Sequence, residues 1–302
     1  MELPKLPSEA VELYNLFIHG VISRRAFLEG VQKFAVGGLA VATIIEALMP
    51  NYAQGQQVSK ADDRIKATYE TVPSPQGNGS IKGYLVRPVS ADSRAEKPAR
   101  LPGIIVVHEN RGLNPHIEDI TRRLALANFM AFAPDGLTSL GGFPGDDYRG
   151  GQMFSKVDGK KMTEDFVAAA LWLKSRPDCT GKIAATGFCY GGGMSNTLAV
   201  RLGADLAAAA PYYGGAPANK EDVAKIKAAV LVHHGELDTR LVATWPAYET
   251  GLKAANVPHE GHIYPGAVHG FNCDATPERY NKAAADLAWQ RTIDWFNKYT
   301  RA

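Results

Sequence analysis

The pattern of apolar and polar positions divides the chain at about residue 59. Beyond it, short apolar or β-branched runs alternate with longer segments whose apolar residues recur every three or four positions. The short runs predict strands at residues 84–86, 103–107, 129–134, 182–186, 206–212, 228–233 and 259–264. The longer segments predict helices at residues 117–128, 163–174, 194–202, 243–255 and 279–299.

This alternation predicts an α/β fold with a mostly parallel central sheet and helices on both of its faces. The run at residues 103–107 contains no polar residue, as expected for a strand that is buried on both sides. A Gly-rich polar stretch at residues 138–160 shows neither the helix nor the strand period, so it predicts a surface loop.

Residues 1–58 form a separate N-terminal segment with its own pattern. The pair Arg24-Arg25 precedes an uncharged run at residues 34–45, and this order resembles the signal that exports folded proteins. This interpretation predicts a periplasmic protein. The uncharged run is shorter than the roughly 20 apolar residues that cross a bilayer, so we expect no integral membrane span.

The alternative for this segment is a helical extension in a cytoplasmic protein, packed on the domain or on a neighbouring subunit. Four apolar residues would then share one helical face: Leu13, Leu16, Phe17 and Ile18. The remainder, residues 59–302, is long enough for one large α/β domain.

The composition narrows the class of protein. The chain has 302 residues, 45% of them hydrophobic and 21% charged, which excludes a disordered, collagen-like or coiled-coil protein. Its formal net charge of +2 provides no field for holding nucleic acid. Three cysteines, Cys179, Cys189 and Cys273, leave at least one free thiol, and no CxxC pair suggests zinc.

The segment 187–191 reads G-F-C-Y-G and lies between a predicted strand and a predicted helix. In the G-x-S-x-G elbow of α/β-hydrolases, this sharp turn presents a nucleophile, and Cys189 occupies the nucleophile position. A thiol at a helix N-terminus also meets the positive end of the helix dipole, which favours the thiolate.

Two further residues follow predicted strands in the order that α/β-hydrolases use. Asp238 comes just after the strand at 228–233, and His269 comes after the strand at 259–264. The sequence therefore predicts a triad in which His269 moves the proton of the Cys189 thiol while Asp238 orients the imidazole. The backbone N–H groups of Tyr190 and Asn110 are the candidates for the oxyanion hole.

Four segments together resemble the dienelactone hydrolase family, or carboxymethylenebutenolidases, across roughly residues 65–300. They are Glu109-x-x-Gly112, the elbow at 187–191, His234-Gly235-x-x-Asp238 and Tyr264-x-Gly266-Ala267-x-His269-x-Phe271. The resemblance implies an α/β-hydrolase fold and hydrolysis of lactone or ester bonds.

The resemblance also implies roles for residues around the triad. Glu109 would meet the resting thiol and help to control its ionisation. Two arginines would bind a substrate carboxylate, and Arg149 and Arg279 are the candidates in this chain.

Other functions remain open on the same residues. A broad-specificity esterase or a peptidase could use this fold and triad, and a noncatalytic binding protein could retain it. The histidines lack an HExxH pair or a carboxylate cluster at ligand spacing, so we expect neither a metal nor another cofactor. The expected partner is a small ester or lactone, and a homo-oligomer is among the expected states.

Overall fold

An eight-stranded sheet runs through the part of the chain that this computed structural model describes, which is residues 6–18, 20–35, 40–89 and 100–301. The strands are β1 (Ile65–Ser74), β2 (Gly79–Pro88), β3 (Leu101–Val107), β4 (Met130–Pro134), β5 (Cys179–Phe188), β6 (Ala208–Tyr212), β7 (Ala229–Gly235) and β8 (His259–Tyr264). Their order is β1-β2-β4-β3-β5-β6-β7-β8. β1 and β2 are antiparallel to their neighbours, whereas β4, β3 and β5 to β8 are parallel. The predicted mostly parallel α/β sheet is confirmed.

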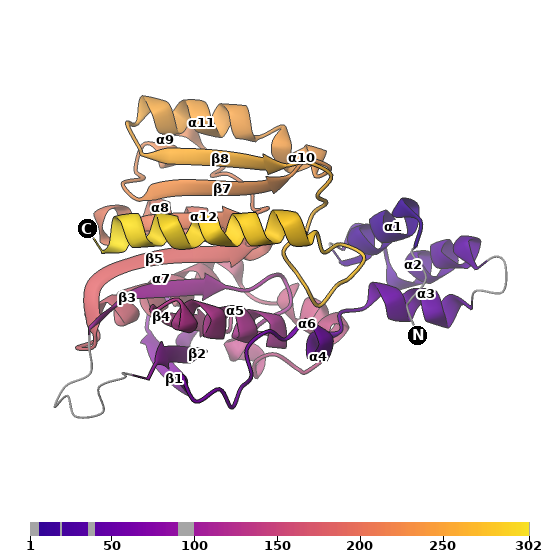
Figure 1. The fold of residues 1–302 in the computed structure, drawn as a ribbon, viewed down its shortest axis with the longest axis horizontal. Coiled ribbons are helices and arrows are strands. Elements are labelled where there is room, and N and C mark those ends of the chain that lie inside the picture. The colour runs from indigo at the N-terminus through magenta and orange to yellow at the C-terminus, as the bar shows by residue number, and fades with distance from the viewer. Residues whose placement is uncertain (1–5, 19, 36–39, 90–99, 302) are drawn as a thin grey trace.

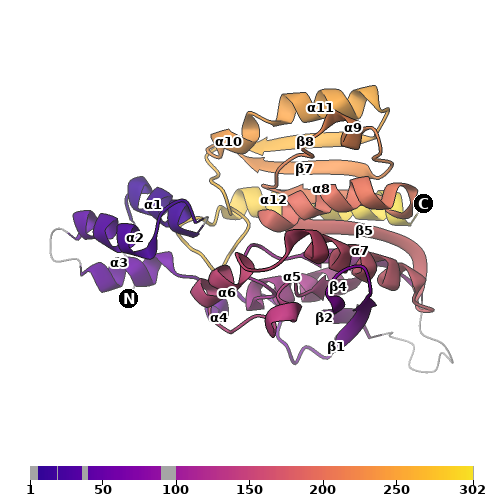
Figure 2. The same ribbon diagram turned by 180° about the vertical axis from the view of Figure 1, so that it is seen from behind.

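Helices cover both faces of the sheet (Figures 1 and 2). One face carries α5 (Pro115–Leu126) and α12 (Lys282–Thr300), which pack in one apolar core with β3 to β7. The other carries α7 (Gly159–Ser175), α8 (Tyr190–Leu202) and α11 (Trp245–Ala254), which form a second core. The short helix α9 (Lys220–Val223) also packs in this second core, whereas α10 (Thr239–Val242) contributes Leu241 to the first. All seven residues of β3 are buried, as its uninterrupted apolar run predicts.

The prediction of a loop at residues 138–160 is wrong in its middle. This stretch contains a single 3₁₀ turn (Thr138–Leu140) and helix α6 (Asp147–Phe154), and α7 already begins at Gly159. Asp146 caps α6 by accepting a hydrogen bond from the Arg149 amide at 2.7 Å. Glycine at position 150 hides the helical pattern, but it is needed there because a Cβ atom would lie 2.4 Å from the carbonyl oxygen of Arg111.

The N-terminal segment is helical. It contains α1 (Ser8–Ile18), α2 (Arg24–Val31), a 3₁₀ turn (Gln32–Phe34), α3 (Val41–Leu48) and α4 (Tyr52–Gly55). The first three helices have a small core of their own, and of the four residues expected on one face, Leu13, Phe17 and Ile18 pack against it while Leu16 is exposed. These helices stand beyond the carboxyl ends of the parallel strands (Figure 1).

The end of the N-terminal segment is hydrogen-bonded to the α/β domain. The amide of Asn51 donates to the carbonyl of Ala275 at 2.6 Å, and the Gln57 side chain donates to Asp274 at 2.7 Å. The uncharged run at residues 34–45 falls partly outside the described residues. Within the described part of the chain, no helix has both the length and the apolar character needed to cross a bilayer.

Candidate active site

Cys189 lies in the sharp turn between β5 and α8. Its backbone has φ 56° and ψ −113°, a conformation that is strained for a residue with a side chain. The glycines on either side make the turn possible. A Cβ atom on Gly187 would lie 2.2 Å from the carbonyl oxygen of Gly191, and one on Gly191 would lie 2.1 Å from that of Val107. The chain thus holds Cys189 at the first turn of α8, in the elbow geometry that the sequence predicts.

His269 joins the elbow to an acid on a neighbouring loop. The Nδ1 atom of His269 lies 2.5 Å from Oδ2 of Asp238, which directly precedes α10 after β7. The sulfur of Cys189 lies close enough to the His269 ring to raise its pKa. The structure therefore brings together Cys189, His269 and Asp238 in the order of a nucleophile, a base and an orienting acid.

The electrostatics of the three groups favour charge separation. Burial would lower the pKa of His269, but the sulfur of Cys189 and the carboxylate of Asp238 raise it to about 9. Burial would raise the pKa of Asp238, yet its hydrogen bond with His269 and the charge of that ring hold it below its usual value. This arrangement stabilises the imidazolium form of His269.

The oxyanion candidates lie at the same end of the sheet. Asn110 follows β3, and Tyr190 is the first residue of α8. Gly191 lies very close to the end of β3, so the start of α8 packs next to the segment that carries Asn110. The Asn110 side chain donates to the carbonyl of Ile18 in α1 at 3.0 Å, so the N-terminal segment reaches this point.

Glu109 lies among buried cations rather than in a solvated loop. Burial would raise the pKa of its carboxyl, but the guanidinium groups of Arg279 and Arg111, with His116 and His269, hold it below the usual value. Both arginines are buried, and Arg111 also forms an ion pair with Asp147 at 3.4 Å. The carboxylate of Glu109 is therefore ionised in this site.

Of the two arginines expected at the site, the structure brings only Arg279 to it. Arg149 lies on the exposed side of α6, and its side chain makes no ion pair with any residue in the described ranges. Arg111 takes part instead, and no motif pointed to it. Its signal in the sequence is its place two residues after Glu109, inside the segment at 109–112 that follows β3.

A second cysteine–histidine–carboxylate set lies beside the first, and sequence reasoning missed it. Nδ1 of His116 lies 3.2 Å from Oδ1 of Asp274, and Cys273 lies close enough to the same ring to raise its pKa. Burial opposes a charge on His116, but Cys273 and Asp274 raise its pKa to about 10. Cys273 is buried and has no elbow around it. These residues come from α5 and from the loop before α12, so no spacing could have grouped them.

Two other buried histidines, His108 and His233, make hydrogen bonds within the fold. His108 accepts a hydrogen bond from the Gly136 amide at 2.8 Å, and burial lowers its pKa. His233 bonds Tyr264 and Thr292 at 2.9 and 3.0 Å, and burial lowers its pKa as well. Across the described ranges, no group of three or more His, Cys, Asp or Glu side chains is arranged to hold a metal ion.

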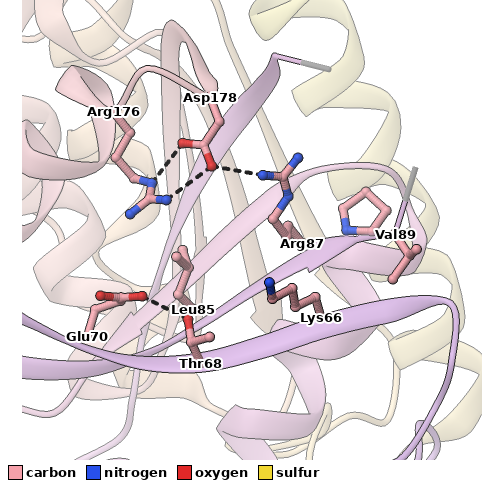
Figure 3. A pocket seen from close by; sticks show the side chains of 9 residues that line it. Lys66, Thr68, Glu70, Leu85, Arg87, Val89, Arg176 and Asp178 are labelled. Carbon is pink, nitrogen blue, oxygen red and sulfur yellow. Dashed lines mark hydrogen bonds and ion pairs between the residues drawn. The ribbon is translucent and has the colours of Figure 1, made fainter. Parts of the chain in front are cut away.

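A hollow of about 420 Å³ lies far from this chemistry (Figure 3). Three of its charged groups already pair with one another: Arg87 and Arg176 each approach Asp178 at 2.9 Å. Asp178 precedes the first residue of β5, whereas Cys189 follows its last, and ten residues of strand span roughly 30 Å. This hollow is therefore not part of the triad site.

The chain is similar to known hydrolases over most of its length. The sequence profile described as "Dienelactone hydrolase family" matches residues 81–300. A protein of Escherichia coli O157:H7 named "Putative carboxymethylenebutenolidase" is 33% identical over 256 residues, which are 80% of this chain and 90% of that protein.

Two solved structures have the same fold. A structure titled "Putative Dienelactone Hydrolase" from Klebsiella pneumoniae matches with a TM-score of 0.67 and 29% identity, over 78% of this chain and 99% of the other. A structure titled "Dienelactone Hydrolase-like Promiscuous Phospotriesterase P91", from metagenomic libraries, matches with a TM-score of 0.63 and 26% identity over 77% and 98% of the two chains.

Proposed function

This chain belongs to the dienelactone hydrolase family, and from that premise we propose that it hydrolyses lactone or carboxylic ester bonds through a thioester on Cys189. The observation that carries the proposal is the chain of contacts from Cys189 to His269 and on to Asp238 at a strained elbow. Strain at such a position is retained where the surrounding fold holds a reactive group in place.

The first half of the reaction forms the acyl-enzyme. The Cys189 thiolate attacks the carbonyl carbon of the ester, and the carbonyl oxygen becomes an oxyanion between the N–H groups of Tyr190 and Asn110. The tetrahedral intermediate then expels the alkoxide. The His269 imidazolium gives its proton to this oxygen, so an alcohol leaves and a thioester with a neutral imidazole remains. In a lactone, the alcohol stays attached to the acyl group.

The second half regenerates the thiol. A water molecule attacks the thioester carbonyl while the neutral His269 accepts one of its protons. The C–S bond breaks, the carboxylic acid is released, and the imidazolium–thiolate pair forms again. Asp238 keeps the Nδ1–H of His269 in place throughout, at the 2.5 Å contact that the structure contains.

The test is hydrolysis of p-nitrophenyl acetate by a Cys189→Ala variant. We expect kcat/KM to fall by about 10⁴-fold or more, since the nucleophile is lost while the fold is retained. Cys179→Ala is the matched control, because this buried thiol lies at the opposite end of β5 and should keep the activity within about threefold. Comparable activity in the two variants would exclude Cys189 as the nucleophile.

A further inference from the structure

The N-terminal segment reaches the site through α1. The core of α1, α2 and α3 stands at the carboxyl ends of the parallel strands (Figures 1 and 2). The Phe17 ring lies 5.9 Å from the Tyr148 ring of α6, and the Arg24 guanidinium lies 5.2 Å from the same ring. Together with the hydrogen bond from Asn110 to Ile18, these contacts seat α1 over the loop that follows β3.

One side chain of α1, that of Tyr14, reaches deeper into the domain than these contacts do. Tyr14 is only 1% exposed, and its ring faces the Arg279 guanidinium at 5.5 Å. Burial raises the pKa of its hydroxyl group, and the nearby Arg111 guanidinium opposes that rise. A residue of the N-terminal segment therefore covers Arg279, one of the two buried arginines beside Glu109.

The arginine cluster is balanced in charge but has an unused donor. Two carboxyl groups, Glu109 and Asp147, face the two guanidinium groups of Arg111 and Arg279. The Arg279 side chain is only 5% exposed, and its Nε atom makes no hydrogen bond with any described residue. A guanidinium edge with an unused N–H is a binding group for an anion such as a carboxylate.

The space beside the Tyr14 cover has a different character. A hollow of about 460 Å³ is lined by Asn110, by apolar side chains that include Phe17, Ile18 and Phe154, and by the charged side chains of Arg24, Arg111 and Asp147. Asn110 is the oxyanion candidate, and the Phe154 ring lies 4.7 Å from that of Tyr190. Arg111 and Asp147 form an ion pair at 3.4 Å, so an acyl group that leaves the oxyanion hole on this side meets apolar side chains beside a paired charge.

We propose that Tyr14 is a specificity-determining residue, which closes Arg279 to anions and directs the enzyme to esters whose acyl group is uncharged. The inference rests on the proposed ester hydrolysis. Because the segment that carries Tyr14 is joined to the domain through α4, the closing group is part of the same chain.

The experiment compares a neutral and an anionic acyl group of equal carbon number, as p-nitrophenyl pentanoate and mono-p-nitrophenyl glutarate. The full-length wild type should prefer pentanoate. Tyr14→Ala should raise the ratio of kcat/KM for glutarate to that for pentanoate by about tenfold, and Arg279→Gln added to Tyr14→Ala should remove this gain. Tyr14→Phe keeps the covering ring and should keep the ratio near that of the wild type.

Phe27→Ala is the matched control. Phe27 is buried in the same small core and lies 6.0 Å from the Tyr14 ring, so its loss loosens the segment without uncovering an arginine directly. Its ratio should stay within about twofold of the wild type. An equal rise in Phe27→Ala and Tyr14→Ala, or no rise in a folded Tyr14→Ala, would overturn the role of Tyr14.

Alkylation of Cys189 separates this inference from the proposed function. Iodoacetate and iodoacetamide differ in charge, and peptide mass analysis reports their rates at Cys189 without any ester turnover. Tyr14→Ala should raise the rate ratio of iodoacetate to iodoacetamide by about tenfold, again dependent on Arg279. If neither ester is turned over but this ratio rises, ester hydrolysis fails while the closing role of Tyr14 stands; an unchanged ratio rejects that role.

Discussion

At the residue scale, Glu109 shows how buried charges of opposite sign support one another. Its carboxylate faces Arg279, Arg111 and two histidines inside the protein. Removing one member of such a cluster leaves the others buried without compensation, which costs more than the pairing itself contributes.

We predict that Glu109→Gln lowers the free energy of unfolding by about 3 kcal/mol at pH 7. The folded-state pKa of Glu109 is lowered, so its stabilisation is present above the unfolded-state value of about 4.5 and is lost as the pH falls through the folded-state pKa. The difference between wild type and variant in urea unfolding should therefore shrink in acid.

Glu164→Gln provides the control for that prediction. Glu164 pairs with Arg201 at 2.8 Å on the surface, where both side chains are partly exposed. Its loss should change the unfolding free energy by less than about 1 kcal/mol. Equal effects of the two substitutions would show that Glu109 does not hold the arginines.

Sequence reasoning reached the triad because each member follows a strand end in a recognisable segment, as G-F-C-Y-G does around Cys189. It missed Arg111, His116 and Cys273 for a physical reason. Their roles arise from burial beside a partner that is distant in sequence, as with the contact between His116 and Asp274. Neither spacing nor residue type encodes such a contact.

At the scale of elements, the elbow depends on how closely α8 approaches β3. A Cβ atom on Gly191 would lie only 2.1 Å from the carbonyl oxygen of Val107. Gly193, two residues further along the same helix, has no atom nearer than 3.7 Å to such a Cβ.

We predict that Gly191→Ala lowers the unfolding free energy by about 3 kcal/mol or more and abolishes ester hydrolysis, because the backbone of the turn must shift. Gly193→Ala should be neutral or stabilising by up to about 1 kcal/mol, since alanine favours the helix. Thermal unfolding and p-nitrophenyl acetate hydrolysis measure both effects. A tolerated Gly191→Ala would contradict the close packing of strand and helix.

Two elements that the sequence failed to predict, β1 and α6, have weak periodic patterns for different reasons. β1 is an edge strand whose residues are mostly exposed, so its apolar alternation is weak. α6 contains two glycines, of which packing requires Gly150, and these lower the helical signal. The parallel strands in the centre were predictable because both of their faces are apolar.

At the scale of the whole molecule, the N-terminal helices connect two interpretations of the chain. The pair Arg24-Arg25 resembles an export signal, and the same helices pack over the active site. A helical extension that packs on the domain was the alternative to the export signal, and the sequence could not show that Tyr14 would meet Arg279, which is far along the chain.

We propose that the arginine pair acts as an export signal and that the protein reaches the periplasm. Arg25 is exposed and pairs only with Glu29, at 2.9 Å, among the described ion pairs, so lysine can replace it without loss of a buried contact. Arg24→Lys with Arg25→Lys should abolish export of the folded protein in cell fractionation, because such signals require arginine rather than positive charge alone. Arg64→Lys, at an exposed site in the domain, should leave export unchanged. If export is the same in the Arg24→Lys, Arg25→Lys double variant and in Arg64→Lys, the N-terminal helices have only a packing role.

The central claim is that Cys189 carries the acyl group during turnover, and trapping that intermediate tests it most directly. Wild type and Cys189→Ala are mixed with excess p-nitrophenyl acetate, quenched in acid during the first turnover, digested and analysed by mass spectrometry. We expect one acetyl group on the peptide that contains Cys189 in the wild type, removable by hydroxylamine, and none at that position in the variant. An acetyl group on another residue with unchanged turnover in Cys189→Ala would contradict the account.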